Sequence, residues 1–375
     1  MKILYVSNGS NFEGAGGMEY HLIDITDWLN SRGVETALAV RKGTFLHLRR
    51  HEGVKKVYPL SWTGFGKIIS FFDVAKAVFD FSPDIVSINR ERDIVRILLM
   101  VKILAPFLKK RPKMVSVFHN VGWKTRPFVF PCLDGVIYPN NYLRDLYVRG
   151  RSAAAVTMSV IHHGIAMPNV DAALKLNPHR KRKYFKDRGF PIIGMVGELR
   201  KNQTELIDVA YHLKRQLPDF TVAIAGRGKE DEIKHLKDKI DRLGLTKHFI
   251  FTGNVDRSVI PDIFFDLDIS VTTNRSEPFG IVFIESLAAC TPLVAYDSGG
   301  PVEVLQRGGG ILVTGGPEEM AGHLFRLVSD HEARKAMGLA GRTAAEKYFS
   351  IDAMGEKHYQ FYANLLEKDG TRKES

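Results

Sequence analysis

Short apolar runs alternate with longer amphipathic stretches along the first half of the chain. The apolar runs predict strands at 3–6, 36–40, 85–88, 114–118 and 135–138, and the amphipathic stretches predict helices at 18–32, about 67–80 and about 91–108. Strands separated by helices of this length form βαβ units, in which the strands lie parallel in one sheet. The first half therefore predicts an α/β domain.

A second alternation of the same kind begins after residue 190. It predicts strands at 192–196, 221–225, 249–251, 269–272, 293–295 and 311–313, and helices at about 203–216, 229–243, from 280, 317–329, 332–348 and 351–367. Residues 166–190 show little periodicity and carry the basic run 179–183, so we interpret them as a linker. A chain of 375 residues fits two domains of ~100–200 residues each.

Two doubly wound sheets in sequence predict where a ligand would bind. In open α/β sheets, ligands lie beyond the carboxyl ends of the strands. We therefore expect the functional site in a cleft between the two domains.

Composition narrows the class of protein. With 45% hydrophobic and 25% charged residues, the chain has ordinary globular values, which exclude disordered and collagenous proteins. Cys132 and Cys290 form no CxxC pair, which argues against a disulfide scaffold or zinc ribbon and fits a reducing compartment. The first residues are too short an apolar run for a signal peptide, and Arg96 and Lys102 interrupt the longest apolar stretch. We expect a cytoplasmic protein without a membrane span.

Positive charge is concentrated in the first half. The net charge is +11, and residues 1–165 hold 23 Lys and Arg against 13 Asp and Glu. A polyanionic partner, either nucleic acid or an anionic membrane, would therefore contact this half. A basic but merely solvated surface is the alternative.

Two carboxylates flank the start of one predicted helix. Glu277 follows the strand at 269–272, and Glu285 lies about one and a half turns inside the helix that begins near Gly280. Unpaired N–H groups at a helix start suit phosphate or hydroxyl oxygens, and paired acceptors suit the hydroxyls of sugars and ribose. From the spacing alone, Glu277 is equally well a dipole partner of the first turn and Glu285 a solvated helix residue.

A longer motif around these carboxylates resembles the signature of the family 4 glycosyltransferases. It comprises Glu277-x-Phe279-Gly280-x4-Glu285, the run 288–295 and Ser298-Gly299-Gly300-Pro301-Val302-Glu303. Segments 14–19, 117–120, 160–165, 224–228 and 251–255 also resemble family motifs, so the likeness covers nearly the whole chain. It implies the GT-B fold, an α/β architecture of two Rossmann-like doubly wound domains that face each other across a cleft.

The resemblance also implies what each part of the chain does. Residues 1–165 would bind the acceptor, 166–190 would be the linker, and 191–350 would bind the nucleotide-sugar donor. Residues 351–375 would form a helix that packs back towards the first domain.

Within the second domain, the resemblance implies a donor site. Glu277 would contact hydroxyls of the transferred sugar, and Glu285 would contact the ribose. The remaining donor contacts implied there are the backbone amides of Phe279, Gly280 and Ile281 and, near the base, the loops of Arg227 and Val255.

In the first domain, three residues are implied. Gly16 and Gly17 lie in a glycine-rich turn between a strand and a helix, which suits close approach to a diphosphate. The turn lacks the full GxGxxG and Walker patterns, so a plain turn is the alternative. His119 ends a strand and would contact the sugar as a catalytic residue, although a lone histidine is more often structural. His162 and His163 are adjacent on extended chain and point to opposite faces, so we interpret them as loop residues and not as metal ligands.

One position departs from the family pattern. The family usually has Gly-Arg-Leu-x3-Lys at the start of its second domain, where the Arg and Lys neutralise the diphosphate. Here Glu198 and Gln203 occupy those two positions. We expect Arg200 and Lys201 to replace the missing cations; otherwise they are solvated loop charges and the enzyme is slow or inactive.

The resemblance implies a retaining glycosyltransferase that moves a sugar from a UDP- or GDP-sugar to an acceptor hydroxyl. Its place would be bacterial cell-surface glycan synthesis: lipopolysaccharide, O-antigen, capsule or glycolipid. The resemblance implies that neither a metal nor a cofactor is required. The alternatives are a nucleotide-sugar epimerase of the same fold and a non-catalytic nucleotide-sugar-binding protein. Nucleic acid is not expected, because no reading motif accompanies the basic residues.

A basic and apolar segment suggests a membrane partner for a lipid-linked acceptor. Residues 90–113 combine apolar side chains with eight Lys and Arg and two acids, and Phe65, Ile68, Ile69, Phe71 and Phe72 form a second apolar stretch. We expect the protein at the inner face of the cell membrane, held by anionic lipid. The alternative is that both segments are helices whose apolar faces belong to the core.

Overall fold

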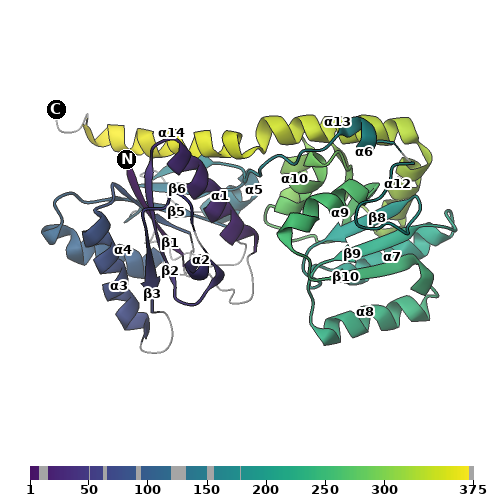
Figure 1. Ribbon diagram of the computed structural model, residues 1–375, viewed down its shortest axis with the longest axis horizontal. Coiled ribbons are helices and arrows are strands. Elements are labelled where there is room, and N and C mark those ends of the chain that lie inside the picture. The colour runs from purple at the N-terminus through teal and green to yellow at the C-terminus, as the bar shows by residue number, and fades with distance from the viewer. Residues whose placement is uncertain are drawn as a thin grey trace. The chain divides into compact units, whose positions relative to one another are not determined.

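The computed structural model describes residues 1–7, 16–49, 51–61, 66–89, 94–119, 132–149, 156–177 and 179–370, with the backbone alone for 66–69, 173 and 368–370 (Figure 1). The chain divides into two compact units. Unit 1 comprises Met1–Gly164 and Ile351–Ser375, and unit 2 comprises Ile165–Ser350.

Unit 1 is built on a parallel seven-stranded sheet in the order β3-β2-β1-β4-β5-β6-β7. Its strands are β1 (Lys2–Ser7), β2 (Glu35–Arg41), β3 (Lys56–Leu60), β4 (Ile85–Ile88), β5 (Lys113–Val117), β6 (Gly135–Tyr138) and β7 (Thr157–Val160). Its helices are α1 (Gly17–Ser31), α2 (Phe45–Leu48), α3 (Gly66–Phe81), α4 (Ile94–Leu104), a 3₁₀ turn (Ala105–Phe107), α5 (Asn141–Val148) and α14 (Ile351–Gly370).

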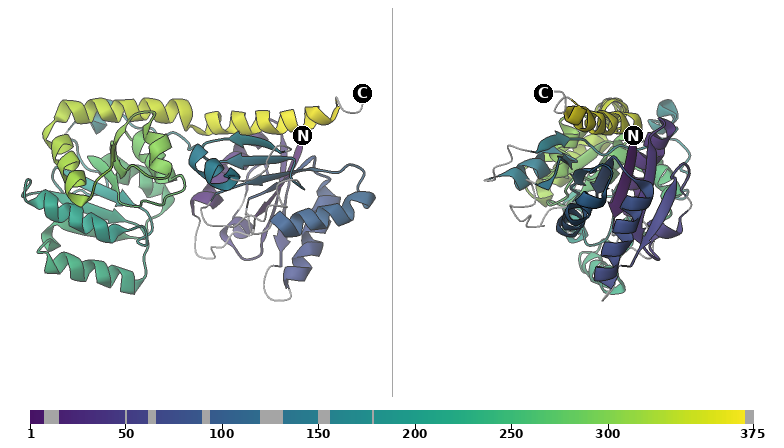
Figure 2. Two further views of the ribbon diagram at one scale, coloured as in Figure 1. Left: turned by 180° about the vertical axis from the view of Figure 1, so that it is seen from behind. Right: turned by 90° about the vertical axis from the view of Figure 1, so that its left-hand side faces the viewer.

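Helices cover both faces of this sheet, which explains its continuous apolar strands. In β1, Leu4 and Val6 pack in a core with α3 and α4, whereas Ile3 and Tyr5 pack in a second core with α1 and α14. Successive side chains of a strand point to opposite faces, so a sheet covered twice buries every position. Figure 2 shows α14, the yellow helix, running along unit 1, and Trp28 Nε1 of α1 donates to Asp352 Oδ1 of α14 at 2.7 Å.

Unit 2 contains a parallel six-stranded sheet in the order β10-β9-β8-β11-β12-β13. Its strands are β8 (Ile192–Val196), β9 (Thr221–Ala225), β10 (Phe249–Gly253), β11 (Ile269–Thr272), β12 (Leu293–Tyr296) and β13 (Gly310–Val313). Its helices are α6 (Ala172–Lys175), α7 (Gln203–Lys214), α8 (Glu230–Arg242), α9 (Ile260–Asp266), α10 (Ile281–Ala288), α11 (Gly300–Leu305), α12 (Pro317–Ser329) and α13 (His331–Tyr348), with 3₁₀ turns at Thr246–His248 and Arg257–Val259.

The two parallel sheets confirm the predicted α/β class, and the later helices lie close to their predicted ranges. The predictions missed the strands β3 and β7 and the short helices α2, α5, α6, α9 and α11. Both missed strands are edges of the first sheet, where one side lacks a neighbouring strand and apolar runs are weaker. Pro59 within β3 further weakens its strand signal.

The segment predicted as a linker is anchored on unit 2. Arg180 and Arg182 of its basic run are buried and form ion pairs with Asp268, at 2.9 and 2.8 Å. These two positions of the run are therefore fixed by the fold and are not solvated charges.

None of the helices in the described ranges combines the length and apolar character needed to cross a bilayer.

Candidate functional site

The predicted site residues fall into one group in each unit. Gly16, Gly17 and His119 belong to unit 1. The others belong to unit 2: Arg200, Lys201, Arg227, Val255, Glu277, Phe279, Gly280, Ile281 and Glu285. Most of the second group lies on loops and a helix start that follow β8, β9 and β11, at the carboxyl end of the sheet.

The loops after β8 and β9 touch backbone to backbone. The amide of Gly197 donates to the carbonyl of Ala225 at 2.8 Å. Gly226 has φ +154°, and a Cβ there would lie 1.9 Å from the carbonyl oxygen of Gly197. Only glycine permits this approach, which brings the side chains that follow each strand together.

Glu198, in the position where the resemblance implies an arginine, binds two predicted donor residues. Its Oε1 accepts from Arg227 NH2 at 2.8 Å, and its Oε2 accepts from Arg200 Nε at 2.6 Å. Partial burial opposes ionisation of Glu198, but the hydrogen bonds from both arginines outweigh it and lower the pKa of this carboxyl. Gln203 Nε2 donates to the carbonyl of Glu198 at 2.7 Å and thereby braces the loop.

Lys201 is held on Glu277. Lys201 Nζ donates to Glu277 Oε2 at 2.8 Å, and Asn274 Nδ2 donates to the same oxygen at 3.0 Å. The Lys201 loop is tied to the end of β11, because Asn202 and Thr273 exchange hydrogen bonds of 3.1 and 2.7 Å. Arg200, in contrast, has a side chain that is 73% exposed, so the adjacent cations occupy different environments.

Glu277 is buried just before the N-terminus of α10. Gly280 is the N-cap of this helix with φ +82°, and a Cβ there would lie 2.2 Å from the Phe283 ring. The carbonyl of Glu277 accepts from the amide of Gly300, the first residue of α11, at 2.8 Å. The starts of α10 and α11 therefore meet at Glu277, and Glu285 is half-buried within α10.

In unit 1, the described part of the glycine turn is held by a local hydrogen bond. Gly16 is the N-cap of α1, and its amide donates to Glu19 Oε2 at 2.9 Å. Gly17 is the first residue of the helix. The described part of this turn is thus a capped helix start, and residues 14 and 15 of the predicted segment 14–19 lie outside the described residues.

His119 follows β5 and is buried among three histidines that the sequence did not bring together. They are His21 of α1, His163 after β7 and His358 of α14. Burial lowers the pKa of His119 to about 4 and that of His358 to about 3. No sequence signal joins four residues so far apart; only the fold does. Across the described ranges, no group of three or more His, Cys, Asp or Glu side chains could hold a metal ion.

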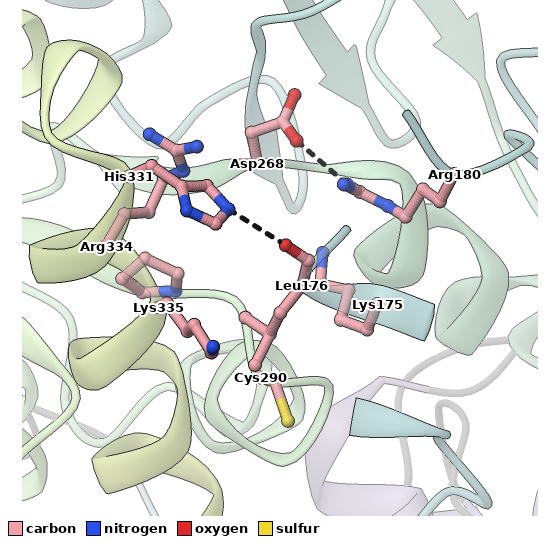
Figure 3. A pocket seen from close by; sticks show the side chains of 9 residues that line it. Lys175, Leu176, Arg180, Asp268, Cys290, His331, Arg334 and Lys335 are labelled. Atoms are coloured by element: carbon pink, nitrogen blue, oxygen red, sulfur yellow. Dashed lines mark hydrogen bonds and ion pairs between the residues drawn. The ribbon is translucent and has the colours of Figure 1, made fainter. Parts of the chain in front are cut away.

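A cavity elsewhere in unit 2 has a structural role. Figure 3 shows it lined by Lys175, Arg180, Asp268, Cys290 and Arg334, among others. Lys175 Nζ donates to three backbone carbonyls, of Phe264, Phe265 and Leu267, while burial lowers the pKa of this amine. Lys175 and Arg180 donate hydrogen bonds to the backbone carbonyls at the carboxyl end of α9 and thereby hold the segment 166–190 against this helix.

Two family profiles match the chain. "Glycosyltransferase Family 4" matches residues 15–167, and "Glycosyl transferases group 1" matches residues 177–344. Together they span both units.

Curated relatives are similar over part of their length. A GDP-mannose-dependent alpha-(1-6)-phosphatidylinositol monomannoside mannosyltransferase of Mycolicibacterium smegmatis is 29% identical over 245 residues, which cover 60% of this chain and 62% of the relative. The lipopolysaccharide core biosynthesis mannosyltransferase LpsB of Rhizobium meliloti is 29% identical over 276 residues, covering 66% of this chain and 70% of the relative.

Solved structures share the fold. A glycosyltransferase from Rickettsia africae superposes with a TM-score of 0.81 at 20% identity, covering 97% of this chain and 98% of the other. Anabaena Alr3699/HepE in complex with UDP and glucose gives 0.76 at 20% identity, covering 97% and 99%. Both match across the two units.

Proposed function

Because this chain belongs to the family 4 glycosyltransferases, we propose that it transfers a sugar from a nucleoside diphosphate sugar to an acceptor hydroxyl. The observation that carries the proposal is Glu277. It is a buried carboxylate at the N-terminus of α10, held by Lys201 and Asn274, within the motif that resembles the family signature. A carboxylate fixed beside backbone N–H donors suits a ligand that carries both hydroxyls and phosphate.

The donor would bind along these elements of unit 2. Glu277 accepts hydrogen bonds from hydroxyls of the transferred sugar, and Glu285 accepts from the ribose. The amides of Phe279, Gly280 and Ile281 face the diphosphate, and the loops of Arg227 and Val255 lie near the base. In unit 1, Gly16 and Gly17 contact the diphosphate and His119 the sugar.

The chemistry we propose retains the anomeric configuration and needs no metal or cofactor. The bond from the anomeric carbon to the diphosphate breaks as the acceptor oxygen attacks the same face, and the leaving diphosphate takes the acceptor's proton. Lys201 would support this charge, because its part-buried ammonium group lies beside Glu277, where it could also contact a diphosphate oxygen. Arg200 contributes less, since its exposed charge is already bound to Glu198.

The names of the relatives suggest the substrates. A mannosyltransferase that uses GDP-mannose and a structure with UDP both resemble this chain, so a GDP- or UDP-sugar is the proposed donor. A lipid-linked or glycan acceptor in cell-surface glycan synthesis fits the phosphatidylinositol and lipopolysaccharide relatives.

A donor screen tests this function. The protein is incubated with UDP-, GDP- and ADP-sugars, and thermal shift and product analysis are recorded with lipid-linked and soluble glycan acceptors. We expect one nucleotide to stabilise the protein and its sugar to be transferred; a ligand at 100 times its Kd adds ~2.7 kcal/mol. Binding without transfer across the panel would contradict an enzymatic role.

One observation favours a non-catalytic nucleotide-sugar-binding protein as the second candidate. Glu198 neutralises Arg227 and Arg200 where a leaving diphosphate would need free positive charge. In that case Lys201→Ala would weaken donor binding, and no acceptor would yield product.

We also propose that unit 1 docks on an anionic membrane at the inner face of the cell membrane. α3 and α4 contact each other (Figure 1). They and the 3₁₀ turn after α4 present five exposed large apolar side chains, Phe72, Phe79, Leu99, Ile103 and Phe107, of which Phe107 is 74% exposed. Ile94, Ile97, Met100 and Val101 on the other face of α4 belong to the core.

Exposed cations lie on the same two helices and on the segment that follows the 3₁₀ turn. They are Lys76, Lys102, Lys109, Lys110 and Arg111, and Lys110 also pairs with Asp84. Apolar side chains that enter the headgroup region, together with cations that contribute ~1 kcal/mol each near anionic lipid, give reversible attachment. Residues 90–93 and Phe65 of the predicted segments lie outside the described residues.

A further inference from the structure

Four histidine rings from four distant segments form one buried cluster in unit 1. His21 and His163 bring their Nδ1 atoms to 2.9 Å, with ring centroids 4.4 Å apart. His163 also stacks on His119, with centroids 5.4 Å apart and an interplanar angle of 4°. His358 closes the cluster at 5.7 Å from His21. Each side chain is less than a tenth exposed.

We propose that His163 and His21 form a positioning pair that fixes the ring of His119, the catalytic residue of the proposed function on which this inference rests. The near-parallel stack sets the plane of the His119 ring, and the hydrogen bond to His21 sets the rotation of His163. The pair acts through His119 and does not itself touch substrate.

The chemistry of the pair follows from its geometry. In a neutral imidazole one ring nitrogen is a donor and the other an acceptor, so an Nδ1···Nδ1 hydrogen bond requires opposite tautomers in the two rings. Protonation of both rings would leave two N–H groups facing each other. The bond therefore holds only while at least one of the two rings is neutral.

The surroundings keep the rings neutral. The titratable groups whose charges act on these two rings are other histidines: His163, His119 and His358 act on His21, and His119, His358 and His162 act on His163. Tyr362 of α14 lies beside His358, with centroids 5.7 Å apart. Burial and neighbouring imidazoles both disfavour a charge here, and both lower the pKa of His21 and of His163.

His163 makes both contacts that define the arrangement. Its ring stacks on His119, and its Nδ1 is hydrogen-bonded to Nδ1 of His21.

Kinetics of single and double variants test the pair. His163→Phe and His21→Phe each keep a ring and remove the hydrogen bond, which is worth roughly three- to tenfold. We expect each to lower kcat by that factor with the donor KM within about twofold. Both substitutions remove the same hydrogen bond. The kcat of the double variant should therefore be no lower than that of the less active single variant.

The matched control is a buried histidine in unit 2. His248 stacks on Phe220 with centroids 4.3 Å apart and bonds the Phe220 carbonyl through Nδ1 at 3.0 Å. His248→Phe should lower the melting temperature without changing kcat. Wild-type kcat in both cluster variants, or losses that multiply in the double variant, would overturn the positioning role.

Histidine NMR on the wild-type protein separates this inference from the proposed function. With ¹⁵N-labelled histidine at neutral pH, we expect opposite tautomers for His21 and His163 and a shifted His119 signal in His163→Phe. If no preparation transfers a sugar, the proposed function fails. The spectra then still show whether His21 and His163 form the hydrogen-bonded pair that positions the His119 ring. Identical tautomers, or an unmoved His119 signal, would overturn it.

Discussion

At the residue scale, the adjacent cations Arg200 and Lys201 differ in exposure and in hydrogen-bond partner. Lys201 has 27% of its side chain exposed and bonds Glu277, whereas Arg200 is 73% exposed and bonds Glu198. Ion pairs between exposed side chains have small interaction free energies, because water and salt screen them. A part-buried cation is screened less and binds phosphate more strongly. Lys201 is tied to the end of β11 through Asn202. We therefore expect it, more than Arg200, to replace the cations that the resemblance implies at positions 198 and 203.

We predict that changing Lys201 and Arg200 together to Ala lowers affinity for the nucleoside diphosphate far more than for the free nucleoside. Lys201→Ala alone should account for most of the loss, more than tenfold, since a charged hydrogen bond is worth ~1.5–3 kcal/mol. Isothermal titration with both ligands measures this. Equal losses for the two ligands would identify these side chains as surface charges.

Substitutions of the two carboxylates of the motif, Glu277 and Glu285, should affect different kinetic quantities. Glu285→Ala is expected to weaken nucleotide binding more than tenfold, and Glu277→Gln to lower turnover more than tenfold with a smaller effect on nucleotide affinity. Titration and steady-state kinetics on both variants check this. Wild-type nucleotide affinity in Glu285→Ala would remove its ribose contact.

The histidine cluster makes unit 1 sensitive to acid. The pKa values are about 4 for His119 and about 3 for His358 in the fold, against ~6.5 when unfolded. The unfolded chain binds more protons below pH 6.5, so the free energy of unfolding should fall as the pH drops from about 6.5 towards 4. Each ring contributes at most ~1.4 kcal/mol per pH unit.

Urea unfolding at pH 7.5, 6 and 5 measures this slope. Paired carboxylates lose their contribution mainly below ~pH 5, so the upper window isolates the histidines. His358→Leu should flatten the slope. A stability that is constant from pH 7.5 to 5 in the wild type would argue against neutral, buried rings.

At the element scale, periodicity predicted the buried strands and long helices, because each repeats one local pattern. It missed β3 and β7, which are sheet edges. The α10 motif is local in sequence, so Glu277 and Glu285 could be proposed from it, but the Glu198–Arg227 pair and the histidine cluster depend on segments joined only by the fold. The sequence pattern could not predict the burial of Arg180 and Arg182 against Asp268 for the same reason.

The docking of α14 on α1 gives a test at this scale. A Cβ on Gly355 would lie 2.2 Å from the Trp28 ring, so Gly355→Ala should destabilise unit 1 by about 1–3 kcal/mol. The matched control is Gly322→Ala in α12, where nothing lies within 4 Å and up to ~1 kcal/mol of stabilisation is expected. Denaturant titration compares them; equal effects would contradict close packing of α14.

At the scale of the whole molecule, the exposed apolar and basic surface on α3 and α4 predicts membrane binding. Flotation should show attachment to anionic but not neutral vesicles, with release at high salt. A Lys109/Lys110/Arg111→Glu variant, folded by circular dichroism, should stay in solution. Indifference to lipid charge would remove the electrostatic part, and a variant that still binds would remove the assigned surface.

The central claim is that this chain transfers a sugar with retention of configuration at a site built on Glu277. The most direct measurement is the proton NMR spectrum of the product formed from an α-linked nucleotide sugar, with Glu277→Gln in parallel. The account predicts an α-linked product from the wild type and more than tenfold less of it from the variant. A β-linked product, or equal yield from both proteins, would contradict it.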